Sequence, residues 1–101
     1  MKALLITPYS QSVESVELAG QDDIKALIGF DNIASDEIGP EGSYLYFDEE
    51  CFLRGTSGRF QIDSIIPVSG RGVIVGVEGD GITLRDVVMD ADELRSRIKY
   101  L

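Results

Sequence analysis

The sequence contains no histidine and no tryptophan, and it has a single cysteine. Without an imidazole the chain cannot assemble a Ser-His-Asp triad, a histidine zinc site or a Cys-His catalytic pair. Lysine and arginine are scarce, at 9 residues against 18 Asp and Glu, so the formal net charge is −9. Because nucleic-acid affinity depends on Lys and Arg displacing counterions, we expect no direct nucleic-acid partner.

Long apolar runs and a second cysteine are also missing. The opening apolar run, residues 3–6, stops before Pro8 and is far shorter than the core of a signal peptide. No segment approaches the roughly 20 apolar residues of a membrane-spanning helix. Cys51 has no disulfide partner, and its acidic neighbours do not favour a reactive thiolate, so we expect it to pack as a small hydrophobe. These features predict a cytoplasmic protein that does not associate with membranes.

The composition is that of a folded globule, with 44% hydrophobic and 27% charged residues. A length of 101 residues fits a single domain spanning residues 1–101. Alternating and continuous apolar segments, separated by turn residues, predict several β-strands. These expected strands cover residues 2–7, 13–18, 44–47, 51–53, 60–62, 65–68, 73–77 and 82–87, with an irregular strand over 31–38.

Two short helices complete the prediction. Residues 24–28 have helical apolar spacing, preceded by Asp22 and Asp23 and followed by Gly29. Asp90 and Glu93 have the spacing of a capping box, which predicts a helix start at residue 90. The apolar positions expected on its buried face are Ala91, Leu94, Ile98 and Leu101. The sum is an α+β fold, with a five- to six-stranded antiparallel or mixed sheet and two short helices on one face.

Negative charge is concentrated in the first half of the chain. Residues 1–50 hold eleven acids and two bases, whereas residues 51–101 hold seven of each. Such an excess is consistent with a solvated surface or with a docking surface for a basic partner. The candidate acids are Glu14, Glu17, Asp22, Asp23, Asp31, Asp36, Glu37, Glu41, Asp48, Glu49 and Glu50.

An aromatic run, an acidic tripeptide and a second apolar run at residues 44–53 predict a β-hairpin with an acidic tip. Tyr44 and Tyr46 form an aromatic stripe if their face of the strand is solvated, and belong to the core if a helix covers it. Aromatic side chains beside charges are typical of protein-contact hot spots. The predicted partner-binding residues are therefore Asp36, Glu37, Tyr44, Tyr46, Asp48, Glu49 and Glu50.

Other sites have weaker support. The glycines of residues 70–76 are spaced G-x-G-x-x-x-G and lead into a strand, so they lack the helix N-terminus that holds a pyrophosphate. A small-molecule or nucleotide-binding domain using the 70–72 loop is nevertheless the alternative function. The acidic segments 48–50 and 78–81 lack the spacing of a calcium loop, so we predict no metal and no cofactor. A carboxylate-pair hydrolase is formally open, but no spacing singles out a catalytic pair.

From end to end the chain resembles an uncharacterised family of small proteins encoded by phages, plasmids and integrated elements of bacteria. The resemblance spans most of the length except residues 53–66, and it supplies no catalytic residues. It is carried by the order of Met1-Lys2-Ala3, Val16-Glu17-Leu18, residues 24–28, Tyr46-Phe47-Asp48-Glu49-Glu50, Gly70-Arg71-Gly72-Val73-Ile74-Val75-Gly76 and the helix starting at Asp90.

The resemblance implies a mobile-element origin and a cytoplasmic setting. Together with the acidic first half, it leads to the expectation of a non-enzymatic protein-binding accessory factor. Its partner would be a host or phage protein with a basic surface, such as a nucleic-acid-binding complex of the restriction or CRISPR type, which the carboxylates would inhibit. Because an exposed edge strand supports self-association, both a monomer and a homodimer fit the sequence.

Overall fold

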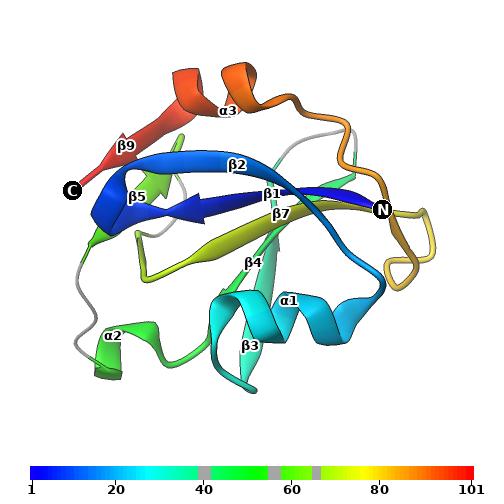
Figure 1. Cartoon of the computed structure of the whole chain (residues 1–101), viewed down its shortest axis with the longest axis horizontal. Coiled ribbons are helices and arrows are strands. Elements are labelled where there is room, and N and C mark those ends of the chain that lie inside the picture. Colours follow the sequence, from blue (N-terminus) through cyan, green and yellow to red (C-terminus); the bar gives the residue numbers. More distant parts are fainter. Residues whose placement is uncertain (39–41, 55–57, 65–66) are drawn as a thin grey trace.

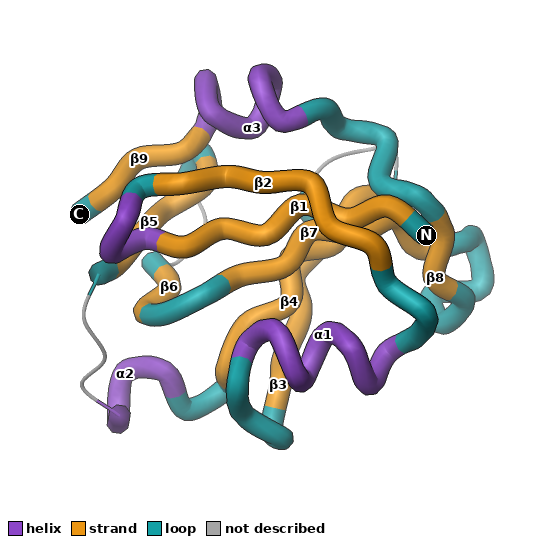
Figure 2. Tube along the Cα trace, in the orientation of Figure 1, coloured by secondary structure: helices purple, strands orange, loops and turns teal. Residues whose placement is uncertain are grey.

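A computed structural model describes residues 1–38, 42–54, 58–64 and 67–101, with residues 52 and 54 described by their backbone alone. Six strands form an antiparallel sheet in the order β2-β1-β7-β4-β3, with β8 also beside β7 (Figure 1). A smaller antiparallel sheet has the order β6-β5-β9 (Figure 2). The elements are β1 (Lys2–Thr7), a 3-10 turn η1 (Pro8–Ser10), β2 (Ser12–Glu17), α1 (Gln21–Ile28), β3 (Ile33–Glu37), β4 (Ser43–Asp48), α2 (Cys51–Arg54), β5 (Arg59–Ile62), β6 (Val68–Ser69), β7 (Gly72–Val77), β8 (Leu84–Arg85), α3 (Ala91–Arg97) and β9 (Ile98–Tyr100).

The α+β class and the six-stranded sheet are confirmed. Strand β7 lies at the centre of the sheet, between β1 and β4, and all of its residues are buried. Glycine is required at Gly72 because a Cβ atom there would lie 2.7 Å from the ring of Phe60, which belongs to the smaller sheet. The two sheets therefore approach each other closely at this point.

The large sheet has an apolar core on each of its faces. On one face, Val73 and Val75 of β7 pack with Ile24 and Ile28 of α1. On the other face, Ile74 packs with residues of the small sheet and of α3. The prediction that both helices cover one face is wrong: α1 and α3 lie on opposite sides of the sheet, as Figure 1 shows. Alternation along β7 directs apolar side chains to both faces, so each face requires a cover.

Helix α1 has the predicted ends. The Asp23 carboxylate accepts a hydrogen bond of 2.6 Å from the backbone N–H of Ala19, ahead of the first turn. Gly29 adopts φ +91°, and its N–H donates to the Lys25 carbonyl at 2.8 Å. A left-handed residue at this place is the usual way to end a helix, and glycine adopts that conformation without steric cost.

Helix α3 begins as predicted and ends earlier. The Asp90 side chain accepts a 2.8 Å hydrogen bond from the Glu93 N–H, which confirms the cap. The helix stops at Arg97, and the chain continues as β9, in which Ile98 pairs with Ile62 of β5. The expectation that Ile98 and Leu101 continue the helical face is therefore wrong. Long-range strand pairing overrides a helical pattern that is only local.

The predicted hairpin at residues 44–53 is also wrong in its second half. Strand β4 is present, but residues 51–54 form the short helix α2. The Asp48 carboxylate accepts from the Glu50 N–H at 3.1 Å, and the Glu50 carbonyl accepts from the Leu53 N–H at 3.0 Å. Hydrogen bonding of an Asp side chain to the backbone two residues later turns the chain and replaces the return strand.

The remaining expected strands are shorter than their apolar patterns suggest. The irregular segment 31–38 forms β3, and the expected strand 82–87 is reduced to the two residues of β8, which pairs with β7. Of the expected strand 65–68, residues 65 and 66 lie outside the described part of the chain, and Val68 begins β6.

Candidate functional site

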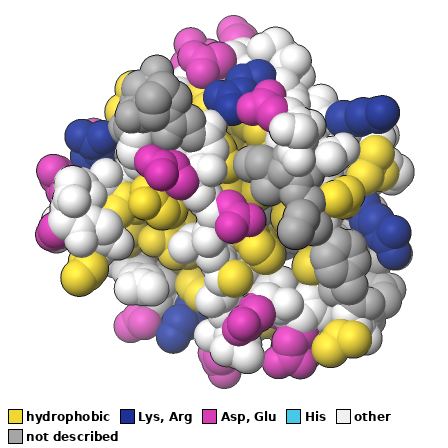
Figure 3. Space-filling model, turned by 180° about the vertical axis from the view of Figure 1, so that it is seen from behind, with side chains coloured by type: hydrophobic (Ala, Val, Ile, Leu, Met, Phe, Trp, Pro, Cys, Tyr) yellow, Lys and Arg dark blue, Asp and Glu magenta, His cyan; other side chains and the backbone are white. Residues whose placement is uncertain are grey.

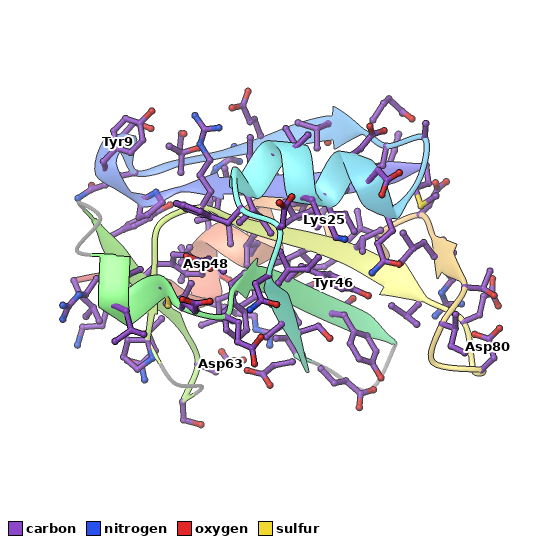
Figure 4. The ribbon with its side chains drawn as sticks, turned by 90° about the horizontal axis from the view of Figure 1, so that it is seen from below. Tyr9, Lys25, Tyr46, Asp48, Asp63 and Asp80 are labelled. Carbon is purple, nitrogen blue, oxygen red and sulfur yellow. The ribbon has the colours of Figure 1, made fainter. Side chains whose placement is uncertain are left out.

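The predicted partner-binding residues are brought to one end of the large sheet, around β3 and β4. Asp36 and Glu37 lie on β3, and Tyr44 and Tyr46 lie on β4, where Glu37 pairs directly with Tyr44. Glu49 and Glu50 follow β4 and are exposed. Figure 4 looks onto the α1 side and shows Tyr46 beside α1 and Asp48 near α2. The structure therefore brings these residues onto two paired strands and the turn that follows, although not all of them lie at the surface, and their role in binding stays a prediction.

Asp48 is the clearest exception among these residues. It is only 3% exposed, and its carboxylate accepts the Glu50 N–H described above. Its predicted place at a solvated hairpin tip is wrong, because Asp48 ends β4 and its buried carboxylate holds the turn of residues 49–50 that leads into α2. We therefore assign Asp48 to the structure of the turn and not to the partner-binding surface.

The two tyrosines combine both roles that their spacing left open. Tyr44 and Tyr46 are half-buried, and Tyr46 packs against the apolar cluster under α1. Burial raises the pKa of Tyr46 above its usual value, and the nearby Tyr44 phenol contributes in the same direction. Tyrosines with a buried ring and an accessible edge are well suited to contact a partner without leaving the core.

The acids of the first half do not form one continuous face. Asp36 pairs with Leu45, whose side chain lies in the core on the α3 side, whereas Glu37 pairs with Tyr44 and lies on the α1 side. Glu14 and Glu17 lie on β2, at the opposite edge of the sheet. Figure 3 shows carboxylates dispersed among apolar and polar side chains on the back of the molecule. The predicted surface is thus reduced to the acids around β3.

Five exposed acids remain in that group, which we call the β3 acidic rim. Glu50 accepts a hydrogen bond of 3.2 Å from the Asn32 side chain, which fixes it beside the start of β3. Residues 26–50 contain no lysine or arginine, and bases reach this region from other elements: Arg85 lines a hollow with Glu37, and Arg97 donates to the Ile38 carbonyl. Glu41 lies outside the described residues. The rim consists of Asp31, Asp36, Glu37, Glu49 and Glu50.

The backbone of β3 itself is open on its outer side. Ile38 donates to the Ser43 carbonyl at 2.9 Å, and the Asn32 carbonyl accepts from Glu49 at 2.9 Å, so the even-numbered residues face β4. In an antiparallel ladder the intervening residues direct their N–H and C=O groups away from the partner strand. These are Ile33, Ser35 and Glu37, for which the structure shows no partner among the described residues.

The other edge of the large sheet is covered in part. There the outward carbonyl of Val13 on β2 accepts a 2.8 Å hydrogen bond from the guanidinium of Arg95, and α3 packs beside β2. Native proteins commonly cover or charge their sheet edges to prevent unwanted pairing. Here α3 and Arg95 occupy part of the β2 edge, whereas the described residues leave the outward backbone groups of β3 without a partner, beside exposed carboxylates. Sequence reasoning missed Ile33 and Ser35, although a short polar segment with two acids is a usual signature of an edge strand.

A hollow of about 390 Å³ opens where β3 and β4 meet the β7–β8 turn. Its charged lining comprises Glu37, Glu78 and Arg85, with Tyr44 at one side and three glycines in the remaining wall. Two carboxylates against one guanidinium leave a negative balance. The hollow therefore suits the end of a cationic side chain better than an anion.

The alternative site at residues 70–72 offers no cradle for a phosphate. Gly72 is buried within β7, and the N–H of Gly70 is already donated to the Gly58 carbonyl at 3.2 Å. Arg71 donates to the Leu27 carbonyl at 3.2 Å. Within the described residues, no group of three or more His, Cys, Asp or Glu side chains is arranged to hold a metal ion.

Comparisons with protein-family models, with curated proteins and with solved structures find no match for this chain. The resemblance to the mobile-element family therefore stays a prediction. None of the described helices has the length and apolar character needed to cross a membrane.

Proposed function

We propose that this protein is a non-enzymatic binding protein that docks a basic partner protein at the β3 acidic rim. The observation that carries the proposal is the coincidence of five exposed carboxylates with the uncovered edge of β3, in a stretch without a single base. The half-buried Tyr44 and Tyr46 lie on the adjacent strand and add aromatic contact area.

Electrostatic docking of this kind depends on like charges that are close enough to reinforce one another. The screening length is about 8 Å at physiological ionic strength, longer than the rise of about 3.3 Å per residue along a strand, so the charges of Asp36 and Glu37 on β3 act together. A partner with a basic groove gains both attraction and faster encounter from such a surface. The partner class we propose is a cytoplasmic nucleic-acid-binding protein of a host defence complex, whose basic groove the carboxylates would occupy.

Affinity capture from bacterial lysate tests the proposal. The variant Glu49→Lys/Glu50→Lys reverses two charges of the rim without altering a buried side chain. The variant Glu14→Lys/Glu17→Lys changes the net charge by the same amount at the opposite edge and is the matched control. Glu17 contacts the N-terminal amine at 3.3 Å, but its side chain is 75% exposed, so loss of that pair affects stability little.

We expect the unaltered protein and the control variant to retain the same basic proteins at low salt, and the rim variant to lose them. Retention should also fall steeply when the salt rises to about 0.5 M, because screening then acts over a few ångströms. Equal capture by both variants, or capture that is indifferent to salt, would exclude the rim as the docking surface.

A further inference from the structure

We infer that the partner contributes an extended basic strand, which pairs with the open edge of β3 and continues the large sheet. This inference deepens the proposed function and rests on it for the charge of the partner. The inference depends on the hydrogen bonds between β3 and β4, which use the even-numbered residues of β3. The backbone N–H and C=O groups of Ile33, Ser35 and Glu37 are therefore directed away from β4. Of the two edges of the large sheet, β3 is the one that carries acids of the rim, whereas Arg95 of α3 already occupies the outward Val13 carbonyl of β2.

The geometry of an open edge specifies what can dock on it. Three outward residues, each with a donor and an acceptor, match an extended segment of about five residues that presents its own groups at the same spacing. Strand addition of this kind obtains its affinity from main-chain hydrogen bonds and its specificity from alternate side chains. Because all pairs of the large sheet are antiparallel, we assign the antiparallel orientation to the added strand.

The side chains of β3 then define a sequence pattern for the partner. In an antiparallel pair, directly opposite residues share a face of the sheet. The residue opposite Glu37 lies on the α1 side, next to the negative hollow, and the following residue lies opposite Asp36 on the other side. Two consecutive basic residues of the partner would therefore pair with Glu37 and Asp36, whose side chains lie on opposite faces of the sheet.

The rest of the pattern follows from the other residues of β3. A polar partner residue suits the position opposite Ser35, and a small partner residue suits the position opposite Ala34. Ile33 is half-buried against the core under α1 and favours an aliphatic neighbour that extends that core. The partner segment thus reads, from its N-terminus, basic, basic, polar, small, aliphatic.

A second copy of this chain fits the edge less well. Pairing about Ser35 would place Glu37 opposite Ile33 and Asp36 opposite Ala34, so the acids of β3 would find no base. Each copy also carries a formal net charge of −9. Charge complementarity therefore favours a basic partner segment over a homodimer.

A synthetic peptide with the sequence Thr-Arg-Lys-Thr-Ala-Val-Thr and capped ends is the probe, and isothermal titration calorimetry at low salt measures its affinity. Its Arg would lie opposite Glu37 and its Val opposite Ile33. Two variants of the protein distinguish strand addition from electrostatic attraction alone. Ser35→Pro removes the outward backbone N–H of residue 35 and leaves the hydrogen bonds between β3 and β4 intact. Ser35→Ala keeps that N–H and is the control.

We expect Ser35→Pro to weaken peptide binding about tenfold or more, and Ser35→Ala to change it less than about twofold. A thermal melt of each variant reports whether the fold is retained. The second measurement uses the unaltered protein, so it does not depend on the stability of a variant. N-methylation of the central Thr, whose N–H would face β3, should abolish binding, whereas N-methylation of the preceding Lys should not.

Each outcome has a defined meaning. Binding that depends on the Arg-Lys pair but ignores the position of the methyl group would overturn strand addition and leave the acidic docking surface standing. Absence of peptide binding at low salt would also overturn strand addition. The proposed function would then be tested by the affinity capture with the charge-reversal variants alone. A concentration-dependent dimer that Ser35→Pro dissociates would show that a second copy occupies the edge, which contradicts the inference.

Discussion

Arg97 holds three parts of the fold together, including the end of β3. Its guanidinium donates to the Ile38 carbonyl at 2.9 Å, just beyond β3, and to the Asp63 carboxylate through Nε at 3.1 Å and through Nη2. The Asp63 N–H in turn donates to the Arg97 carbonyl at 3.2 Å. Replacing Arg97 by methionine keeps the length and the apolar part of the side chain and removes every guanidinium bond.

The expected cost follows from the environment of each bond. The Arg97 side chain is 25% exposed, so its charge-assisted bond to Ile38 contributes about 1–2 kcal/mol. The Asp63 side chain is 46% exposed, and solvent reduces the ion pair to at most about 1 kcal/mol. We expect Arg97→Met to lower the free energy of unfolding by about 2 kcal/mol, which corresponds to a fall in Tm of about 10 °C.

Urea denaturation followed by circular dichroism measures this loss. Lys99→Met is the matched control, because Lys99 is exposed on β9 and loses the same charge, so its effect should stay below about 0.5 kcal/mol. Equal effects of the two substitutions would refute the reasoning, since the loss would then reflect net charge and not the bonds of Arg97.

The same pair gives a pH dependence of defined sign. Hydrogen bonds from Arg97 lower the pKa of Asp63 below its ordinary value of 3.8, so the ionised carboxylate is stabilised in the folded state. The contribution of the pair is therefore present above about pH 5 and disappears as the pH falls through 3.8 towards the folded pKa. The stability difference between the unaltered protein and Asp63→Asn should shrink over that range, and a constant difference would contradict the assignment.

Two further predictions concern the β7–β8 hairpin. Gly76→Ala would place a Cβ atom 2.5 Å from the Asp86 carbonyl oxygen, so unfolding experiments should show a loss of about 3 kcal/mol, while Gly79→Ala, with no atom within 4 Å, should be tolerated. Asp80 accepts hydrogen bonds from the Thr83 side chain and from the Thr83 and Ile82 N–H groups, which lower its pKa to about 2. An NMR titration of the Asp80 carboxyl carbon should have its midpoint near that pH, and a midpoint near the ordinary 3.8 would exclude these hydrogen bonds in solution. The stability that they add is lost as the pH falls through about 2.

The elements that the sequence predicted are those determined by residues near one another along the chain. The β1–β2 hairpin, the central strand β7 and the start of α3 at Asp90 follow from apolar periodicity, turn residues and a capping side chain. The elements it missed depend on distant partners. Helix α3 ends where Ile98 joins β5, and the choice of opposite faces for the two helices depends on the position of the small sheet.

The candidate site shows the same division. The composition drew attention to residues 36–50 because charge and aromatic content are local properties, and their role in binding stays a prediction. The burial of Asp48 and the outward direction of Ser35 depend on how β4 turns and on which residues of β3 face it. Neither property can be predicted before the register of the two strands is known.

Residue-resolved amide hydrogen exchange of the free protein tests the openness of β3 most directly. The N–H groups of Ile33, Ser35 and Glu37 should exchange at rates typical of exposed amides, while those of Ala34, Asp36 and Ile38 should be protected by β4. Protection of Ser35 comparable with that of Asp36 would show that the edge is already occupied in solution, and would contradict the docking edge on which both proposals depend.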